Sequence, residues 1–234
     1  MIVGSDERRY AWMDEGFNTF LNRYSNLEYY GSASVRAAST TGRYAANRMV
    51  APIADQPIMT QPDLVRSRGL GFLAYRKPGF GLVMLRELIL GEERFDAAFK
   101  QYINDWAYKH PKPHDFFRTI EEVAGEELSW FWRGWYQGTD LLDQAIEGVD
   151  SDANGVYIRL VNREGLVMPV DLLIEFENGE TLRQKFPAEI WMQGDRYTFT
   201  LDTDQQVRSV MIDPDGFLPD QDTANNGWTR PILQ

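Results

Sequence analysis

The chain has 234 residues, of which 43% are hydrophobic and 13% aromatic, a composition typical of an ordered globular protein with a sizeable core. Its 24 Lys and Arg residues against 35 Asp and Glu residues give a net charge of -11, which opposes binding to nucleic acid or to an anionic membrane surface. No apolar run approaches the roughly 20 residues that span a bilayer, and the N-terminus lacks the features of a signal peptide, so we expect a soluble chain. The absence of cysteine suits reducing and oxidising compartments alike, which leaves the localisation open, extracytoplasmic sites included.

Residues 1–146 carry the periodicity of amphipathic helices. Apolar residues recur at intervals of three and four, which places one face of each helix in a core. Pro78 and Gly91 are expected to bracket one helix, since proline suits the first helical position and glycine the position just past the end. Pro113 and Gly125 bracket a second helix in the same way. The segment GEELSWFWRGWYQG, residues 125–138, follows as a short helix that is apolar on nearly every side, and we predict that it is buried.

Beyond about residue 148 the apolar residues repeat with the period of two that is typical of strands. Short β-rich runs follow one another, separated by turn residues: VYIRLVN, PVDLLIEFEN, ETLRQKF, RYTFTLD and VRSVMID. Asn178-Gly179, between two of them, indicates a two-residue hairpin. These runs predict a small antiparallel β-sandwich. The polar segment 147–155 reads as a linker, so we expect a helical domain at 1–146 and a sandwich with an irregular tail at 147–234.

The chain's two histidines, His110 and His114, are four residues apart, a spacing that lets both bind zinc from one face of a helix. Pro111 and Pro113 prevent a regular helix through the pair. No glutamate follows His110, as a zinc-peptidase helix requires. We therefore expect a polar connection leading into a helix start.

The segment DPDGFLPDQD, residues 213–222, is similar to a calcium-binding loop in its spacing of aspartates. Such a loop ends in a bidentate glutamate, and this sequence has Ala224 at the required position. A turn-rich exit from the sandwich is the favoured interpretation, with calcium binding as the alternative.

Two other segments carry residues whose surroundings match a known pattern. YAWMDEGFNTFL, residues 10–21, places Glu15 among apolar neighbours, where a carboxylate without a partner is unfavourable. AYRKPGFGLVMLRELILG, residues 74–91, has Tyr75 followed two residues later by lysine and then by an aliphatic helix. Together with residues 95–138, these segments resemble, in order and spacing, the aminopeptidase N family of zinc metallopeptidases, the gluzincins. The resemblance extends over nearly the whole chain, because many members carry a small β-sandwich after the helical lobe.

The resemblance implies an α+β multidomain fold, in which the helical lobe of a thermolysin-like catalytic domain precedes the sandwich. Glu15 would be the third zinc ligand, and Tyr75 would donate a hydrogen bond to the oxyanion of the tetrahedral intermediate. Asp14 would support the metal site by orienting its ligands. Against this role, adjacent helical residues point in different directions.

The family's other two zinc ligands and its general base lie in a His-Glu-x-x-His helix, which would fall before Met1. We therefore expect a truncated portion of a parent aminopeptidase. The intact parent would use zinc to hydrolyse the peptide bond at the free N-terminus of a peptide substrate. One carboxylate does not hold catalytic zinc, so this chain alone is expected to bind no zinc and to be inactive.

Two other classes of function stay open. The first is a non-catalytic binding or interaction module, including one that completes a split enzyme with a separately encoded N-terminal half. The second is a stand-alone interaction or carbohydrate-binding protein that works through its sandwich. The aromatic cluster of the buried helix suits a sugar platform in composition, but its spacing favours a core role. Its members are Trp130, Trp132, Trp135 and Tyr136.

The helix that carries Glu15 is expected to face a missing lobe. That arrangement would leave Trp12, Phe17 and parts of the Tyr75 segment partly exposed. Exposed apolar patches promote association, so self-association or poor stability in solution is predicted.

Overall fold

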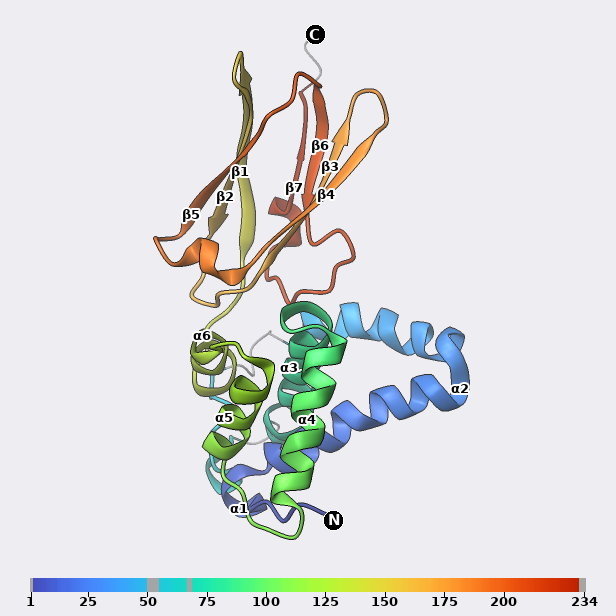
Figure 1. Cartoon of the computed structure of the whole chain (residues 1–234), viewed down its shortest axis with the longest axis vertical. Coiled ribbons are helices and arrows are strands. Elements are labelled where there is room, and N and C mark those ends of the chain that lie inside the picture. Colours follow the sequence, from blue (N-terminus) through green and yellow to red (C-terminus); the bar gives the residue numbers. More distant parts are fainter. Residues whose placement is uncertain (1, 50–54, 67–68, 232–234) are drawn as a thin grey trace. The chain divides into compact units, whose positions relative to one another are not determined.

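The computed structural model describes residues 2–49, 55–66 and 69–231, without the side chains of residues 32–49. The chain forms two compact units, Met1–Thr139 and Asp140–Gln234. The first is helical and the second consists of two antiparallel sheets (Figure 1). The predicted α+β fold, a helical part followed by a β-sandwich, is confirmed.

The helical unit begins with the short helix α1 (Glu7–Tyr10) and the long helix α2 (Trp12–Met49). Gly31 interrupts α2 with φ 74° and ψ 166°, a conformation that suits glycine, and the helix turns back sharply there (Figure 1). The remaining helices are α3 (Lys77–Met84), α4 (Glu92–Trp106), α5 (Pro113–Ala124) and α6 (Ser129–Phe131).

The helix expected to start at Pro78 begins earlier. Wide π-helical turns at Gly71–Arg76 and Leu85–Ile89 flank α3 without a break. A proline inside a regular α-helix clashes with the carbonyl four residues before it and lacks an N–H donor, and a wider turn ahead of Pro78 relieves that conflict. The prediction of a helix start at Pro78 is therefore wrong. Gly91 (φ 83°) ends this helical segment as expected, and Pro113 and Gly125 bound α5.

An aromatic core holds the helices together. Trp12 stacks on Phe117 at 5.8 Å between ring centroids and lies 4.8 Å from Tyr136, while Phe17 lies 4.8 Å from Phe116. Trp12 is 1% exposed and Phe17 7% exposed. The expectation that these two side chains lie partly open is therefore wrong, because α5 and the segment after α6 cover them.

The predicted buried helix near residues 125–138 forms α6 and a π-helical turn at Trp132–Gln137. Trp132, Trp135 and Tyr136 are buried, and Trp130 is partly buried. Their rings belong to the core, as their spacing indicated.

In the part that the structure describes, up to residue 231, the second unit is built from seven strands in two sheets. One has the order β1-β2-β5 and the other β4-β3-β6-β7, with antiparallel neighbours throughout. Apolar side chains from both sheets, such as Ile158, Leu160, Leu172 and Val210, form one buried cluster between them. The strands are β1 (Gln144–Asp152), β2 (Gly155–Asn162), β3 (Val170–Phe176), β4 (Thr181–Phe186), β5 (Arg196–Leu201), β6 (Val207–Ile212) and β7 (Gly227–Thr229).

Two details of this unit differ from the expectation. Residues 147–155, expected as a linker, form most of β1 and its turn into β2. Their polar character fits an edge strand, which commonly carries charges that discourage further pairing. The expected irregular tail returns to the sheet as β7, which pairs with β6.

The turn at Asn178-Gly179 is a hairpin between β3 and β4 as predicted, but its loop has three residues, so the prediction of a two-residue loop is wrong. The N–H of Gly179 donates to the carbonyl of Phe176, and the N–H of Phe176 donates to the carbonyl of Glu180. Gly179 has φ 86°, which completes the bulge that accompanies such loops. Among the described residues, no helix is long and apolar enough to cross a membrane.

Candidate active site

The candidate site forms where α2 crosses the helical segment around α3. Gly16 makes this crossing close, since a Cβ there would lie 2.8 Å from Cβ of Pro78. Gly79 does the same from the other helix, because its Cβ would meet Cγ2 of Thr19 at 2.9 Å. The Thr19 hydroxyl donates to the carbonyl of Glu15 at 2.7 Å. Two glycines thus bring the backbones together beside Glu15.

This crossing joins the two residues that the sequence singled out. The Tyr75 hydroxyl donates a hydrogen bond to Oε1 of Glu15 at 2.6 Å, across 60 positions of sequence. Tyr75 is 38% exposed, and Glu15 is partly buried. The hydrogen bond to Glu15 raises the pKa of the Tyr75 phenol, and partial burial and the negative charge of Glu15 act in the same direction. The phenol is therefore a neutral donor held against a carboxylate.

Two further carboxyl groups lie beside this pair. The hydrogen bond with Asp14, and then the charge of Asp14, raise the pKa of the exposed Glu7 carboxyl. The charges of Asp14 and Glu7 also raise the pKa of Tyr75. Asp14 was predicted to support Glu15, but among the described residues its side chain interacts with Glu7. Glu7 was missed from sequence, because it lies in α1 and Asp14 in α2, and the spacing of seven residues does not show how the two helices meet.

Neither histidine belongs to a cluster of potential metal ligands in the described structure. Nδ1 of His110 is 2.8 Å from the carbonyl oxygen of Gly4, and Nε2 of His114 is 3.3 Å from Oδ1 of Asp115. His110 belongs to the connection after α4, and His114 is the second residue of α5. The described residues contain no group of three or more His, Cys, Asp or Glu side chains that could hold a metal ion.

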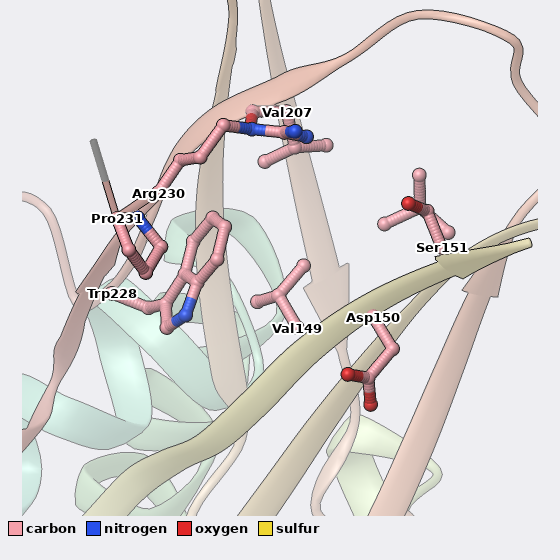
Figure 2. A pocket seen from close by; sticks show the side chains of 8 residues that line it. Val149, Asp150, Ser151, Val207, Trp228, Arg230 and Pro231 are labelled. Atoms are coloured by element: carbon pink, nitrogen blue, oxygen red, sulfur yellow. The ribbon is translucent and has the colours of Figure 1, made fainter. Parts of the chain in front are cut away.

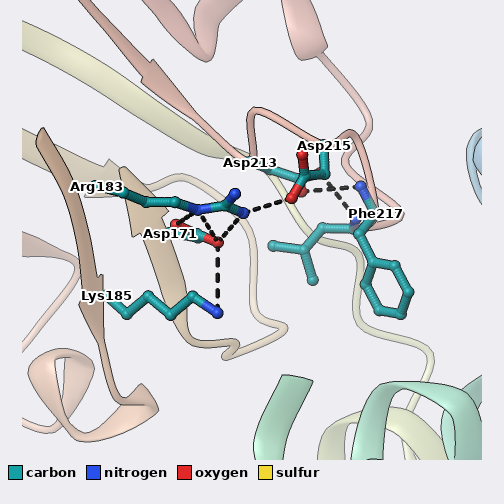
Figure 3. Close-up of polar contacts among 7 residues, drawn as sticks. Asp171, Arg183, Lys185, Asp213, Asp215 and Phe217 are labelled. Carbon is teal, nitrogen blue, oxygen red and sulfur yellow. Dashed lines mark hydrogen bonds and ion pairs between the residues drawn. The ribbon is translucent and has the colours of Figure 1, made fainter. Parts of the chain in front are cut away.

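The aspartates of the segment 213–222 face different partners. Oδ1 and Oδ2 of Asp213 accept hydrogen bonds from the N–H groups of Phe217 and Leu218, each at 2.8 Å. Asp215 forms an ion pair with Arg183. The Nε and Nη2 atoms of Arg183 also donate hydrogen bonds to the buried Asp171 (Figure 3). The buried carboxylate of Asp220 accepts hydrogen bonds from the N–H groups of Gln144 and Asp222 at 2.9 Å. This arrangement supports the turn-rich interpretation of the segment.

The chain matches the model of the peptidase family M1 domain over residues 2–135. It is similar to aminopeptidase M1-C of Oryza sativa subsp. japonica, with 24% identity over 60% of this chain and 16% of that protein. It is also similar to probable aminopeptidase 2 of Sulfurisphaera tokodaii, with 20% identity over 86% of this chain and 24% of that protein. The chain therefore spans a quarter or less of the length of these relatives.

A crystal structure of Legionella pneumophila aminopeptidase A in complex with aspartic acid shares the fold, with a TM-score of 0.59. The sequence identity is 16%, and the match covers 90% of this chain and 24% of that one. The family match covers more than half of the chain and includes both Glu15 and Tyr75. On this evidence, the chain belongs to peptidase family M1.

Proposed function

We propose that the helical unit supplies part of the active site of a zinc-dependent aminopeptidase, with Glu15 as one zinc ligand and Tyr75 as a hydrogen-bond donor to the reacting carbonyl. The observation that carries this proposal is the 2.6 Å hydrogen bond between Tyr75 and Glu15. Through this bond a neutral phenol that is partly exposed to solvent would lie close to a zinc ion bound by Glu15. A donor held beside a metal ligand is well placed to stabilise negative charge that develops on a carbonyl oxygen.

The 234 residues do not fit a complete zinc site. Glu15 is one carboxylate, and a catalytic zinc site takes three protein ligands and an open position. His110 and His114 contact Gly4 and Asp115. We therefore propose that this polypeptide alone retains no zinc and hydrolyses no peptide, and that the remaining ligands and the general base come from a His-Glu-x-x-His segment outside this sequence.

Zinc content of the purified 234-residue chain tests the second part of this proposal. After dialysis against micromolar zinc, elemental analysis should find no retained zinc, and an aminoacyl coumarin amide should not be cleaved. The Glu15→Ala variant should give the same result. Stoichiometric zinc that disappears in Glu15→Ala would show that the chain completes a site by itself, and the proposed inactivity would be wrong.

The roles of Glu15 and Tyr75 are tested in a chain extended with a family member's segment that carries the His-Glu-x-x-His helix. Glu15→Gln should then lose zinc. Tyr75→Phe should keep zinc but lower kcat by about 100-fold, the usual cost of removing one oxyanion donor. Tyr24→Phe is a matched control, because its hydroxyl bonds to Glu87 instead. Unchanged kcat in Tyr75→Phe would refute the donor role.

A further inference from the structure

The β-sandwich contains a pocket of about 320 Å³, and neither Glu15 nor Tyr75 lines it. It opens beside β1 and β7, one edge strand from each sheet, and is completed by residues that follow β7 (Figure 2). This volume lies at the low end of the range for small-molecule sites, about 300–1,000 Å³.

The walls of the pocket are mostly apolar. Val207 is fully buried and forms part of the core cluster, while Val149 and Trp228 are partly buried and pack against that cluster. In Figure 2 the indole of Trp228 and the side chain of Val149 face the same space below Val207. A branched apolar group of modest size would cover these surfaces and remove them from water.

One cation lies at the rim of this apolar pocket. Arg230 reaches across Val207, and its Nε donates to the Val207 carbonyl at 2.8 Å (Figure 2). Its ion pair with Glu177 is long, 3.9 Å, and also uses Nε. Within the described part of the chain, no acceptor bonds either terminal amino group of Arg230. The guanidinium is thus anchored through one nitrogen and keeps a two-pronged donor, the geometry that matches a carboxylate.

Neither of the two nearby acidic residues bonds the terminal amino groups of this cation; Glu177 forms only the long ion pair through Nε. Asp150 lines the pocket, but its carboxylate pairs with Arg159 of β2 and points away from Arg230 in Figure 2. The pocket therefore joins an apolar wall to a positive rim, in a chain whose net charge is -11.

We propose that this pocket binds a carboxylate attached to a branched apolar group, with the carboxylate on Arg230 and the apolar group against Trp228 and Val149. Two sources share this chemistry: a free branched-chain carboxylic acid and the C-terminus of a peptide that ends in an apolar residue. Anchoring of Arg230 by Val207 reduces the side-chain entropy lost on binding.

The test is a titration of the full chain, followed through the indole N–H resonance of Trp228 in ¹H–¹⁵N NMR spectra and assigned with Trp228→Phe. Acetyl-leucine and acetyl-leucinamide differ at the carboxylate alone. We expect acetyl-leucine to shift the resonance saturably and to bind at least 10-fold more tightly than the amide. Equal binding by 4-methylpentanoate would assign the site to carboxylic acids in general, and weaker binding would assign it to peptide C-termini.

Substitutions at Arg230 complete the test. Arg230→Gln should weaken acetyl-leucine binding at least 10-fold, and Arg230→Lys, which keeps the charge but loses the fork, should weaken it less. Arg208→Gln is the matched control, because Arg208 lies on β6 and pairs with Glu175. Equal affinity for acid and amide, an unchanged affinity in Arg230→Gln, or no saturable shift at 20 mM probe would each overturn the proposal.

Discussion

The pKa of the Tyr75 phenol depends on the charge of Glu15. The Glu15 hydrogen bond is the largest cause of its raised pKa. Glu15→Gln keeps an oxygen acceptor but removes the negative charge, so the pKa of Tyr75 should fall toward the ordinary value of about 10. The measurement is a pH titration of the tyrosine Cζ resonances by ¹³C NMR, with Tyr75→Phe to assign the signal.

Asp14→Asn provides the comparison for this titration. The charge of Asp14 is a smaller cause of the shift than the contacts of Glu15. The pKa of Tyr75 should therefore fall less in Asp14→Asn than in Glu15→Gln. A Tyr75 titration that is the same in Glu15→Gln as in the unsubstituted chain would mean that the hydrogen bond does not persist in solution.

Replacing either of two buried tyrosines of the aromatic core by phenylalanine should change the free energy of unfolding at neutral pH, in opposite directions for the two residues. The Tyr102 hydroxyl is buried and has no hydrogen-bond partner among the described residues, whereas the Tyr136 hydroxyl donates to the carbonyl of Pro78 at 3.2 Å. Tyr102→Phe removes an unsatisfied polar group and should raise the free energy of unfolding by about 1 kcal/mol. Tyr136→Phe removes a hydrogen bond and should lower it by about 1 kcal/mol. Urea unfolding of both variants measures the difference, and a destabilised Tyr102→Phe would indicate that a buried water serves this hydroxyl.

At the scale of elements, the crossing of α2 with the α3 segment depends on Gly16. An added Cβ would lie 2.8 Å from Cβ and 2.9 Å from Cγ of Pro78, a ring that has little freedom to move. Gly16→Ala should therefore lower the free energy of unfolding by about 1–3 kcal/mol, the usual cost of overpacking. It should also separate Glu15 from Tyr75, which lowers the pKa of Tyr75.

Gly71→Ala is the matched control for this substitution. Gly71 lies in the same helical segment, and a Cβ there meets nothing within 4 Å among the described residues. Alanine favours helical backbone over glycine by up to about 1 kcal/mol, so Gly71→Ala should be neutral or stabilising. If both variants lose the same stability, backbone effects and not the contact with Pro78 would explain the loss.

The elements were predictable where local chemistry determines them. The caps Pro113 and Gly125 and the turn at Asn178-Gly179 place α5 and the β3–β4 hairpin correctly. Pro78 misled because a π-helical turn accommodates it inside a longer helix. The polar segment 147–155 misled because an edge strand and a linker have similar compositions.

The site could be predicted in part. The family pattern identified Glu15 and Tyr75, and the fold brings them into contact. Glu7 escaped notice because its relation to Asp14 depends on how α1 meets α2. Trp12 and Phe17 were expected to be partly exposed, since the periodicity of one helix does not reveal which other helices pack on it; α5 buries both.

At the scale of the whole molecule, the second unit contains everything that a small sandwich needs. Its two sheets enclose their own apolar cluster, and the buried carboxylate of Asp220 accepts a hydrogen bond from the backbone N–H of Gln144 within the same unit. Residues 140–234 expressed alone should therefore unfold in one cooperative thermal transition with a β-type circular dichroism spectrum. Leu172→Asp, which puts a charge into the cluster, should abolish that transition. A disordered fragment would show that the sandwich depends on the helical unit.

The helical unit should also be sensitive to alkali. Burial raises the pKa of Tyr102 and Tyr136, so the folded state keeps protons that the unfolded state loses near pH 10. The two tyrosines therefore contribute to the free energy of unfolding fully below pH 10, and this contribution is lost as the pH rises toward their folded-state pKa values. The thermal midpoint at 222 nm, a wavelength dominated by helix, should fall between pH 8.5 and 11.

Tyr102→Phe should flatten this decline, and Tyr108→Phe should not, because Tyr108 is 87% exposed. An unchanged slope in Tyr102→Phe would mean that other groups cause the alkaline loss.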